Sequence, residues 1–375
     1  MSVQQTKATA DVLQVRGLKV DFHTYAGDVK ALDGVELTVR KGELLGLVGE
    51  SGCGKTVTAL SIMGLLPPNA EVLGGEVLLD GVDLLKMSKE EIREVRLKDV
   101  AIVFQDPLSY LNPVLTIGSQ IEEIINSQPD LFTSAILKNR LEEIGASQRD
   151  MGGAELTAEK ERLRLVADGK QSLSSQERGK LTRSYILSIM GEVRLPEPEK
   201  VFRSFPFELS GGMRQRVMIS MALVKRPKLL LADEMTTALD VTVQAQILQL
   251  IRELRSEIDA SVVLITHDLA VVAEVCDRVA VMYAGNIVEV AEVSELFKNP
   301  LHPYTQGLLA SVPRVDSSAI EYPSIKGSVP NLIFPPTGCR FHPRCSKAFD
   351  RCPQVKPQLV EAKPGHFVAC LLYGE

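Results

Sequence analysis

The sequence predicts an α/β fold with a mostly parallel sheet, and three observations lead to this prediction. An apolar run, "ELLGLVG" (43–49), passes through a glycine-rich turn into the helical pattern "KTVTALSIMGLL" (55–66), which is the strand–turn–helix order of a phosphate-binding unit. A second helical pattern covers 241–258. Further apolar runs have the length of buried strands: "VAIVFQ" (100–105), "KLLLADE" (228–234) and "SVVLITH" (261–267). Alternating strands and helices are typical of parallel sheets.

The segments outside this core differ in pattern. Residues 12–22 and 31–40 alternate apolar and polar side chains, as half-buried strands do. Residues 122–200 are polar and carry helical patterns at 134–144 and 158–166, which predicts a helical subdomain with a partly mobile polar stretch near 146–182. From about residue 286 the chain becomes proline-rich, which predicts an irregular C-terminal extension.

Composition restricts the class of protein. The 375 residues allow two domains, or one large domain with an appendage, and 45% hydrophobic with 24% charged residues is typical of soluble globular proteins. A net charge of −6 and the absence of Trp argue against a nucleic-acid partner. The N-terminus lacks the apolar core of a signal peptide, and no stretch approaches the roughly 18 apolar residues of a membrane span. We therefore expect an intracellular protein, soluble or peripheral to a membrane, without disulfides.

The stretch "GESGCGKT" (49–56) fits the pattern G-x-x-x-x-G-K-[ST] in the required strand-to-helix context. Glycines let the backbone N–H groups and the helix N-terminus face phosphate oxygens. Lys55 would reach the β- and γ-phosphates, and the Thr56 hydroxyl would bind Mg²⁺. The predicted ATP-binding residues are Gly49, Glu50, Ser51, Gly52, Cys53, Gly54, Lys55 and Thr56.

Two carboxylates end the apolar run 228–234. Asp233 would hold Mg²⁺, and Glu234 would polarise the attacking water. A strand followed by a solvated acidic turn is the alternative interpretation, and the nearby phosphate loop makes it the weaker one.

The stretch "LSGGMRQR" (209–216) places a serine and two glycines at the start of a helix. A hydroxyl and free N–H groups at a positive helix end can bind a phosphate. A plain helix cap would explain Ser210 equally well, but it would not explain Gly211 and Gly212.

Together these motifs resemble the nucleotide-binding subunit of an ABC transporter. The resemblance implies a P-loop ATPase core with an N-terminal antiparallel β-subdomain, over 12–285, and a helical subdomain over about 109–227 with a polar insertion near 146–182. It also implies that "LSGGMRQR" is the signature motif, which completes the ATP site of the opposing subunit in a head-to-tail dimer. The signature residues are then Ser210, Gly211, Gly212 and Gln215.

Other family positions are carried over by resemblance. Gln105 matches the glutamine that senses Mg²⁺ and attacking water, Asp240 matches the D-loop residue that crosses to the partner, and His267 matches the switch histidine at the γ-phosphate. Phe22 stands where an aromatic stacks on adenine, with Tyr25 as the competing choice and a buried hydrophobic role for Phe22 as another. The sequence departs from the family pattern at two places. Met235 stands where the family commonly has proline, and Gln105 and Ser210 are farther apart in the sequence than is usual in the family.

The tail narrows the resemblance. "NPLHPYTQGLLASVP" (299–313) and "GSVPNLIFPPTGCRFHPRC" (327–345) resemble the C-terminal extension, here 286–375, of dipeptide/oligopeptide importer ATPases. Four of the six cysteines gather in this extension: Cys339, Cys345, Cys352 and Cys370.

Four thiolates can surround a metal ion or an iron–sulfur cluster. In the resembled family a similar set binds a 4Fe–4S cluster, whose charge Arg340, Arg344 and Lys347 could offset. Zinc is the alternative, although the gaps exceed those of zinc ribbons. His342 is a candidate zinc ligand, and a role at the surface or beside the ligands is the stronger interpretation of it. Four unligated thiols are the weaker third interpretation. Because the tail lies far in sequence from the phosphate contacts, we expect a structural role.

The resemblance implies an ATPase that powers import of di- or oligopeptides at the cytoplasmic face of the cell membrane. Its implied partners are two permease subunits, a paralogous second ATPase (or a second copy in isolation) and, indirectly, an extracellular solute-binding protein. Oligosaccharides or nickel are alternative solutes. Two other classes are weaker: soluble ABC ATPases usually carry two cassettes, and an ATP-using iron–sulfur redox protein would need an electron-donor site, which we do not recognise.

Overall fold

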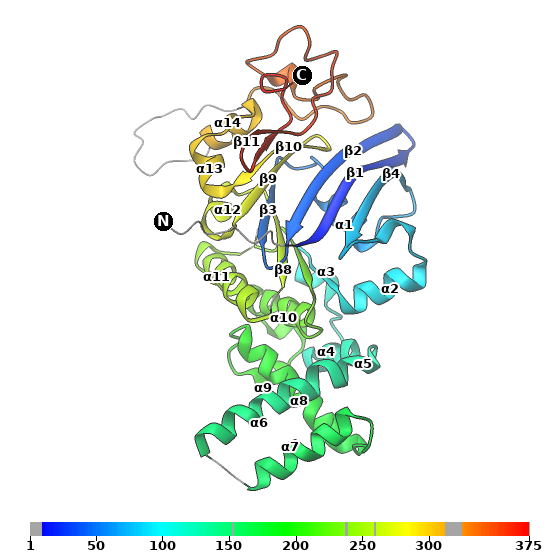
Figure 1. The fold of residues 1–375 in the computed structure, drawn as a ribbon, viewed down its shortest axis with the longest axis vertical. Helices are drawn as coiled ribbons and strands as arrows, with labels where there is room; N and C mark the ends of the chain where they lie inside the picture. The colour runs from blue at the N-terminus through cyan, green and yellow to red at the C-terminus, as the bar shows by residue number, and fades with distance from the viewer. Residues whose placement is uncertain (1–9, 152–153, 237–238, 259, 312–324, 375) are drawn as a thin grey trace, which may run out of the picture. The chain divides into compact units, whose positions relative to one another are not determined.

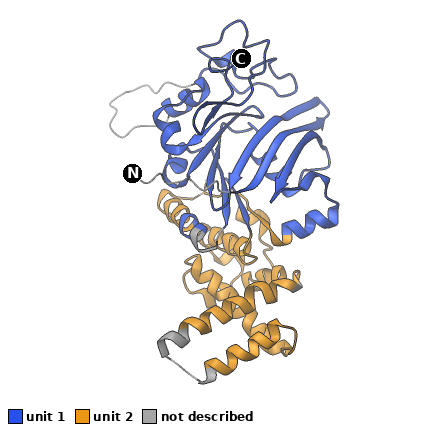
Figure 2. Ribbon diagram, in the orientation of Figure 1, with its two compact units in different colours: residues 1–96, 228–234, 251–375 blue, residues 97–227, 235–250 orange. Residues whose placement is uncertain are grey.

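The computed structural model describes residues 10–151, 154–236, 239–258, 260–311 and 325–374. The chain forms two compact units, shown in Figure 2. Unit 1 comprises residues 1–96, 228–234 and 251–375, and unit 2 comprises residues 97–227 and 235–250. Each unit is therefore assembled from segments that are distant in the sequence.

The strands are β1 (Asp11–Thr24), β2 (Gly27–Arg40), β3 (Leu44–Val48), β4 (Ala70–Leu79), β5 (Val82–Asp83), β6 (Val100–Val103), β7 (Leu229–Asp233), β8 (Ser261–Thr266), β9 (Arg278–Tyr283), β10 (Asn286–Glu292), β11 (Val360–Lys363) and β12 (His366–Val368). The α-helices are α1 (Lys55–Met63), α2 (Lys89–Lys98), α3 (Pro107–Tyr110), α4 (Ile117–Asn126), α5 (Pro129–Leu131), α6 (Lys138–Met151), α7 (Ala154–Ala167), α8 (Ser175–Glu192), α9 (Pro198–Arg203), α10 (Gly211–Leu223), α11 (Val241–Ile258), α12 (Leu269–Val275), α13 (Val293–Lys298) and α14 (Pro303–Ala310). Short 3₁₀ and π turns cover Leu84–Lys86, Phe132–Leu137, Pro206–Glu208 and His342–Arg344.

The main sheet of unit 1 runs in the order β11-β12-β10-β9-β3-β8-β7. The strands β9, β3, β8 and β7 are parallel, whereas β10, β12 and β11 continue the sheet with antiparallel pairing. All residues of β3, β7, β8 and β9 are buried, which explains why they appear as continuous apolar runs. The predicted strands at β3, β7 and β8 are confirmed, and β9 and β10 were not predicted.

A second sheet of unit 1 is antiparallel, in the order β2-β1-β4-β5. The long hairpin β1–β2 pairs from Thr24 and Gly27 at its turn to Asp11 and Arg40 at its end, and register shifts interrupt it. Figure 1 labels the strands β2, β1 and β4 of this sheet, which are coloured dark blue to light blue. The alternating patterns at 12–22 and 31–40 therefore mark half-buried strands, as predicted.

The C-terminal extension is less irregular than the proline content predicts. Residue 286 begins β10, and β10 forms a hairpin with β9 through Ala284 and Gly285, both at positive φ. The extension also packs into the core, because Phe341 is buried with Tyr283 and Tyr304, and ring centroids of these three side chains lie 4.6–5.3 Å apart. The tail thus shares a core with the main sheet.

Unit 2 contains β6 and the helices α3 to α10 together with the first part of α11. The described residues of the predicted polar stretch 146–182 are mainly helical, in α6, α7 and the start of α8. A capping box starts α8, since the Ser174 and Glu177 side chains each bond the other's backbone N–H. Polarity there reflects exposed helix faces rather than an absence of regular structure.

Candidate functional site

The loop between β3 and α1 has the geometry of a phosphate cradle. Gly52 (φ +76°) and Gly54 (φ +112°) adopt backbone conformations that side chains disfavour, and Gly54 leads directly into α1. Ser51 and Thr56 are exposed, whereas Cys53 and Lys55 are buried. Burial raises the pKa of the Cys53 thiol, so it remains a neutral packing group. The exposed rim leaves backbone N–H groups open to an anion.

The Lys55 ammonium is held inside this loop. Its Nζ donates to the carbonyl oxygens of Gly49 at 2.9 Å and Glu50 at 3.1 Å, and the residue is only 4% exposed. Glu234 Oε1 lies 3.8 Å from the same Nζ. A charge fixed in this way can bind phosphate without first being ordered.

Asp233 ends β7 beside Thr56. It is 5% exposed, and its Oδ1 has no hydrogen-bond partner within the described part of the chain. The pKa of Asp233 is raised, mainly by burial and also by Glu234, and a hydrogen bond from Thr56 and the charge of Lys55 oppose this rise. A buried carboxylate with a free oxygen beside a hydroxyl is an oxygen donor set that suits Mg²⁺.

Glu234 and His267 lie together at the ends of β7 and β8. Glu234 has φ +46°, which is uncommon for a residue with a side chain, and its N–H donates to Ile265 O at 2.9 Å. Its Oε1 lies 3.6 Å from His267 Nδ1, and His267 is exposed. Unit 1 thus gathers Lys55, Asp233, Glu234 and His267 as the sequence predicts, because β3, β7 and β8 are neighbours in one parallel sheet.

The two candidates for adenine stacking also lie in unit 1. Phe22 is half-buried in β1, opposite Val29 of β2 and Ala70 of β4. Tyr25 is fully exposed at the turn between β1 and β2. Both alternatives stay open, since neither aromatic is fixed against a loop residue by an interaction in the described chain.

Unit 2 carries the predicted signature residues. Ser210 caps α10, because its Oγ accepts from Met213 N at 3.3 Å, and Gly211 and Gly212 form the first residues of the helix. A Cβ on Gly212 would lie 2.7 Å from Val243, so close packing contributes to the need for glycine there. Ser210 and Gly211 are exposed, whereas Gln215 is 1% exposed.

Two further predicted residues of unit 2 are exposed. Gln105 follows the end of β6. Asp240 precedes α11, and its Oδ1 accepts from Val243 N at 3.0 Å. Both side chains can therefore reach another molecule.

The four tail cysteines line one small cavity of about 20 Å³, together with His302, Phe341, His342 and Phe349 among others. Burial raises the pKa of Cys339 to about 11 and also raises the pKa of Cys345 and Cys370. In the described ranges, no group of three or more His, Cys, Asp or Glu side chains converges as the ligands of a single ion. The four cysteines therefore line one cavity, but the predicted metal-binding extension is not shown.

The structure adds contacts that the sequence did not predict. Arg344 pairs with Glu50 of the phosphate loop, Lys347 Nζ donates to Gln306 Oε1, and Arg340 donates to Ala284 O. We expected these three cations to offset the charge of a cluster, yet each has a partner elsewhere. No local pattern marks these contacts, since they join distant segments.

These features define a P-loop nucleotide-binding protein. The family described as "ABC transporter" matches residues 32–237, and the family described as "Oligopeptide/dipeptide transporter, C-terminal region" matches residues 288–352. A dimeric bacterial ABC transporter cassette has the same fold, with a TM-score of 0.55 at 24% identity over 75% of this chain and 98% of its own.

Curated relatives match nearly the whole chain. The dipeptide transport ATP-binding protein DppD of Bacillus subtilis is 43% identical over 96% of this chain and 94% of its own length. The oligopeptide transport ATP-binding protein OppD of Salmonella typhimurium is 40% identical over 99% of this chain and 98% of its own length. The chain therefore belongs to the ABC transporter family, among the ATP-binding subunits of oligopeptide and dipeptide transporters, and it is an ATPase. No helix in the described ranges is long and apolar enough to cross a membrane.

Proposed function

We propose that the residues around Lys55 hydrolyse ATP and that the energy drives peptide import. One observation carries the proposal: Glu234 Oε1 lies within 3.8 Å of Lys55 Nζ and 3.6 Å of His267 Nδ1, beside the unpartnered Asp233 oxygen. Lys55 and the loop N–H groups bind the β- and γ-phosphates. Glu234 orients water and accepts its proton as the water oxygen attacks the γ-phosphorus and ADP leaves. His267 orients Glu234 and approaches the γ-phosphate.

Thr56 and Asp233, with Gln105 as a further ligand, would hold Mg²⁺, which neutralises phosphate charge when bound. Gly49, Glu50, Ser51, Gly52, Cys53 and Gly54 complete the ATP-binding loop, and Phe22 or Tyr25 stacks on adenine. Residues 12–285 would form the ATPase domain, with a helical subdomain over about 109–227 and its insertion near 146–182. Residues 286–375 would form the extension.

The test of the reaction is Glu234→Gln. It should retain ATP binding and lose turnover by on the order of 10²-fold or more, because it removes the proton acceptor. Glu274→Gln changes an exposed glutamate on α12 and is the matched control. Near-normal turnover of Glu234→Gln in the purified complex would contradict the assignment.

We also propose that two subunits form a head-to-tail dimer, in which the signature residues of one subunit complete the ATP site of the other. These residues are Ser210, Gly211, Gly212 and Gln215, and Asp240 crosses to the partner. The exposure of Ser210 and Gly211 supports this role for them, and the burial of Gln215 makes it the weakest member. Mixing a Lys55→Ala chain with a Ser210 variant gives mixed dimers with one intact site if two copies associate. Absence of any regained activity would count against completion in trans.

The proposed partners are two permease subunits, a paralogous ATPase and, indirectly, an extracellular solute-binding protein. The proposed location is the cytoplasmic face of the cell membrane. The match of residues 288–352 and the peptide transport named for the relatives support a peptide solute. In a reconstituted complex, labelled dipeptides should be taken up with ATP. If nickel or an oligosaccharide stimulates the ATPase and peptides do not, the assignment of a peptide as the transported solute is wrong.

We propose further that Cys339, Cys345, Cys352 and Cys370 hold a 4Fe–4S cluster that stabilises the tail. Their shared cavity supports a common site, and binding would release protons because burial raises the pKa of Cys339, Cys345 and Cys370. The small volume of this cavity, about 20 Å³, favours a single zinc ion as the alternative. Anaerobically purified protein should contain iron and sulfide near four each. One zinc without sulfide would establish the alternative.

A further inference from the structure

The C-terminal extension grips the phosphate loop through one arginine. Arg344 Nη1 donates to Glu50 Oε2 at 2.7 Å, and Nη2 donates to Oε1 at 3.1 Å, which is a bidentate pair. The Arg344 side chain is 7% exposed and that of Glu50 is 27% exposed. Pairs of this geometry are stronger and more specific than single charged contacts, and partial burial reduces their screening by water.

The Arg344 side chain is also held in place by contacts other than its pair with Glu50. Its Nε donates to Lys326 O at 3.0 Å, and Nη2 donates to Gly327 O at 3.1 Å. The guanidinium lies 5.7 Å from the ring centroid of Tyr283. The hydrogen bonds that Arg344 donates to the Glu50 carboxylate raise the pKa of Arg344, which keeps its charge. Little ordering is therefore needed for Arg344 to hold Glu50 in one position.

Glu50 connects this contact to the working parts of the loop. Its carbonyl oxygen accepts from Lys55 Nζ at 3.1 Å, and its N–H donates to Tyr304 Oη at 3.0 Å. Tyr304 lies in α14, which also belongs to the extension. The side chain and the backbone of one loop residue are thus both held by the tail, and the held carbonyl orients the lysine ammonium.

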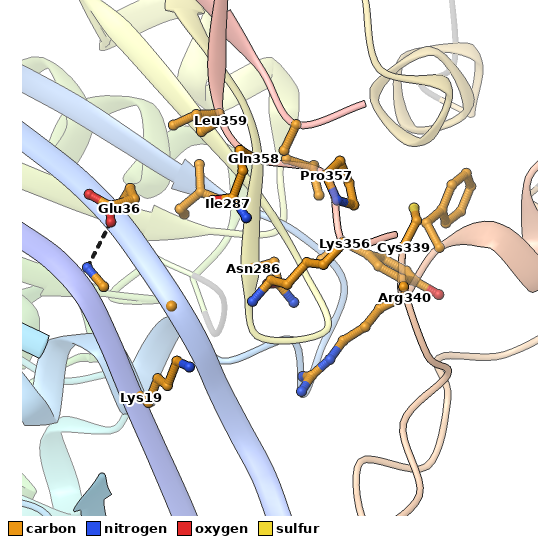
Figure 3. A pocket seen from close by; sticks show the side chains of 17 residues that line it. Lys19, Glu36, Asn286, Ile287, Cys339, Arg340, Lys356, Pro357, Gln358 and Leu359 are labelled. Atoms are coloured by element: carbon orange, nitrogen blue, oxygen red, sulfur yellow. Dashed lines mark hydrogen bonds between the residues drawn. The ribbon is translucent and has the colours of Figure 1, made fainter. Parts of the chain in front are cut away.

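A second connection reaches the same loop. Arg340 donates to Ala284 O at 2.6 Å, and the next residue, Gly285, donates its N–H to Cys53 O at 2.7 Å. Arg340 follows the cavity cysteine Cys339, as Arg344 precedes Cys345. Figure 3 shows Cys339, Arg340 and Lys356 at the wall of a separate cavity of about 290 Å³ between the extension and the antiparallel sheet.

We propose that Arg344 is a positioning residue for ATP binding: it fixes Glu50, and through the Glu50 carbonyl it fixes Lys55 for the phosphates. The proposal rests on the assignment of 49–56 as the phosphate loop. Because Arg344 and Cys345 are adjacent, correct folding of the cysteine cavity is required for a fully ordered loop. The tail thereby links its own integrity to nucleotide affinity.

The test uses the full chain and measures affinity for a fluorescent ATP analogue together with the KM for ATP. Arg344→Ala should weaken both about tenfold, with kcat changed less than about twofold, as expected when a coupled charged pair is removed. Arg344→Lys should lie between it and the parent chain, because lysine keeps the charge and loses the fork. Arg351→Ala is the matched control, since Arg351 precedes Cys352 and is exposed.

The decisive comparison is made in a Glu50→Ala background, which removes both side-chain oxygens that accept from Arg344. There Arg344→Ala should add no further loss of affinity, because its route to the loop is already broken. An equal loss in both backgrounds, unchanged affinity of a folded Arg344→Ala chain, or an equal loss in Arg351→Ala would overturn the proposal. Lys55→Ala distinguishes failure of the positioning role of Arg344 from failure of the phosphate-loop assignment. If Lys55→Ala retains full nucleotide affinity, the phosphate-loop assignment itself fails. If only Lys55→Ala loses affinity, the positioning role alone fails. Cys345→Ser should reproduce the Arg344→Ala affinity, with tail proteolysis as a second readout.

Discussion

Replacing Gly49 by alanine should damage both the fold and the nucleotide site. A Cβ built on Gly49 lies 2.2 Å from the backbone oxygen of Met282 and 2.7 Å from Cys53 Sγ. Met282 belongs to β9, which is paired in parallel with β3, so its carbonyl is not free to move. An ordinary carbon–oxygen contact requires a separation more than about 1 Å greater, and overpacking of this kind costs about 1–3 kcal/mol.

The displacement falls on the first residue of the phosphate loop. Its carbonyl oxygen accepts from Lys55 Nζ at 2.9 Å, so a shift of the backbone moves the ammonium as well. Misplacement by about 1 Å can cost on the order of 10²-fold in rate, and we expect at least a tenfold loss of ATPase kcat/KM. Urea unfolding would measure the stability, and ATP titration would separate binding from turnover.

Gly42→Ala is the matched control for this prediction. Gly42 has φ +70°, and a Cβ there would meet nothing within 4 Å. It should lose about 1 kcal/mol through backbone strain alone and keep its nucleotide affinity. A Gly49→Ala chain with the stability and ATPase activity of the parent would refute the reasoning, as would an equal loss of activity in Gly42→Ala.

Three further predictions concern stability. Burial lowers the pKa of Lys225 to about 8 from 10.5, so the native state binds fewer protons and gains stability as pH rises between these values. Lys225→Met should therefore reduce the increase in Tm between pH 8 and pH 10. If the Tm of the variant rises with pH as steeply as that of the parent chain, Lys225 is not the cause of the increase. Glu289 accepts from two backbone N–H groups and His366, and Glu289→Gln should cost about 2 kcal/mol in urea unfolding and expose the tail to protease. Arg278→Met leaves Glu43 buried without its partner and should cost about 3 kcal/mol, whereas adding Glu43→Leu should recover most of this loss.

The local geometry of the phosphate loop could be predicted from the sequence because its causes are local. Glycines at fixed positions in 49–56 allow positive φ, and the apolar run before them requires a buried strand. The strands β3, β7 and β8 were predictable for the same reason, since strands covered on both faces are continuously apolar. The strands β9 and β10 were not predicted, although β9 is buried throughout like β3. The stretch 146–182 was predicted to be partly mobile because it is polar, whereas its described residues are mainly helical with polar exposed faces.

By itself, the sequence determined the residue types that can perform the chemistry and their order along the chain. The tertiary structure alone decided which of them meet. Glu50 and Arg344 are 294 residues apart, and their pairing depends on the tail packing Phe341 against Tyr283 and Tyr304. Nothing near Arg344 in the sequence distinguishes it from Arg351, since both arginines directly precede a cysteine. In the structure, however, Arg351 is exposed, whereas the Arg344 side chain is largely buried. The difference arises because a long-range charged contact is set by the path of the whole chain, whereas periodicity and motif spacing report only neighbours.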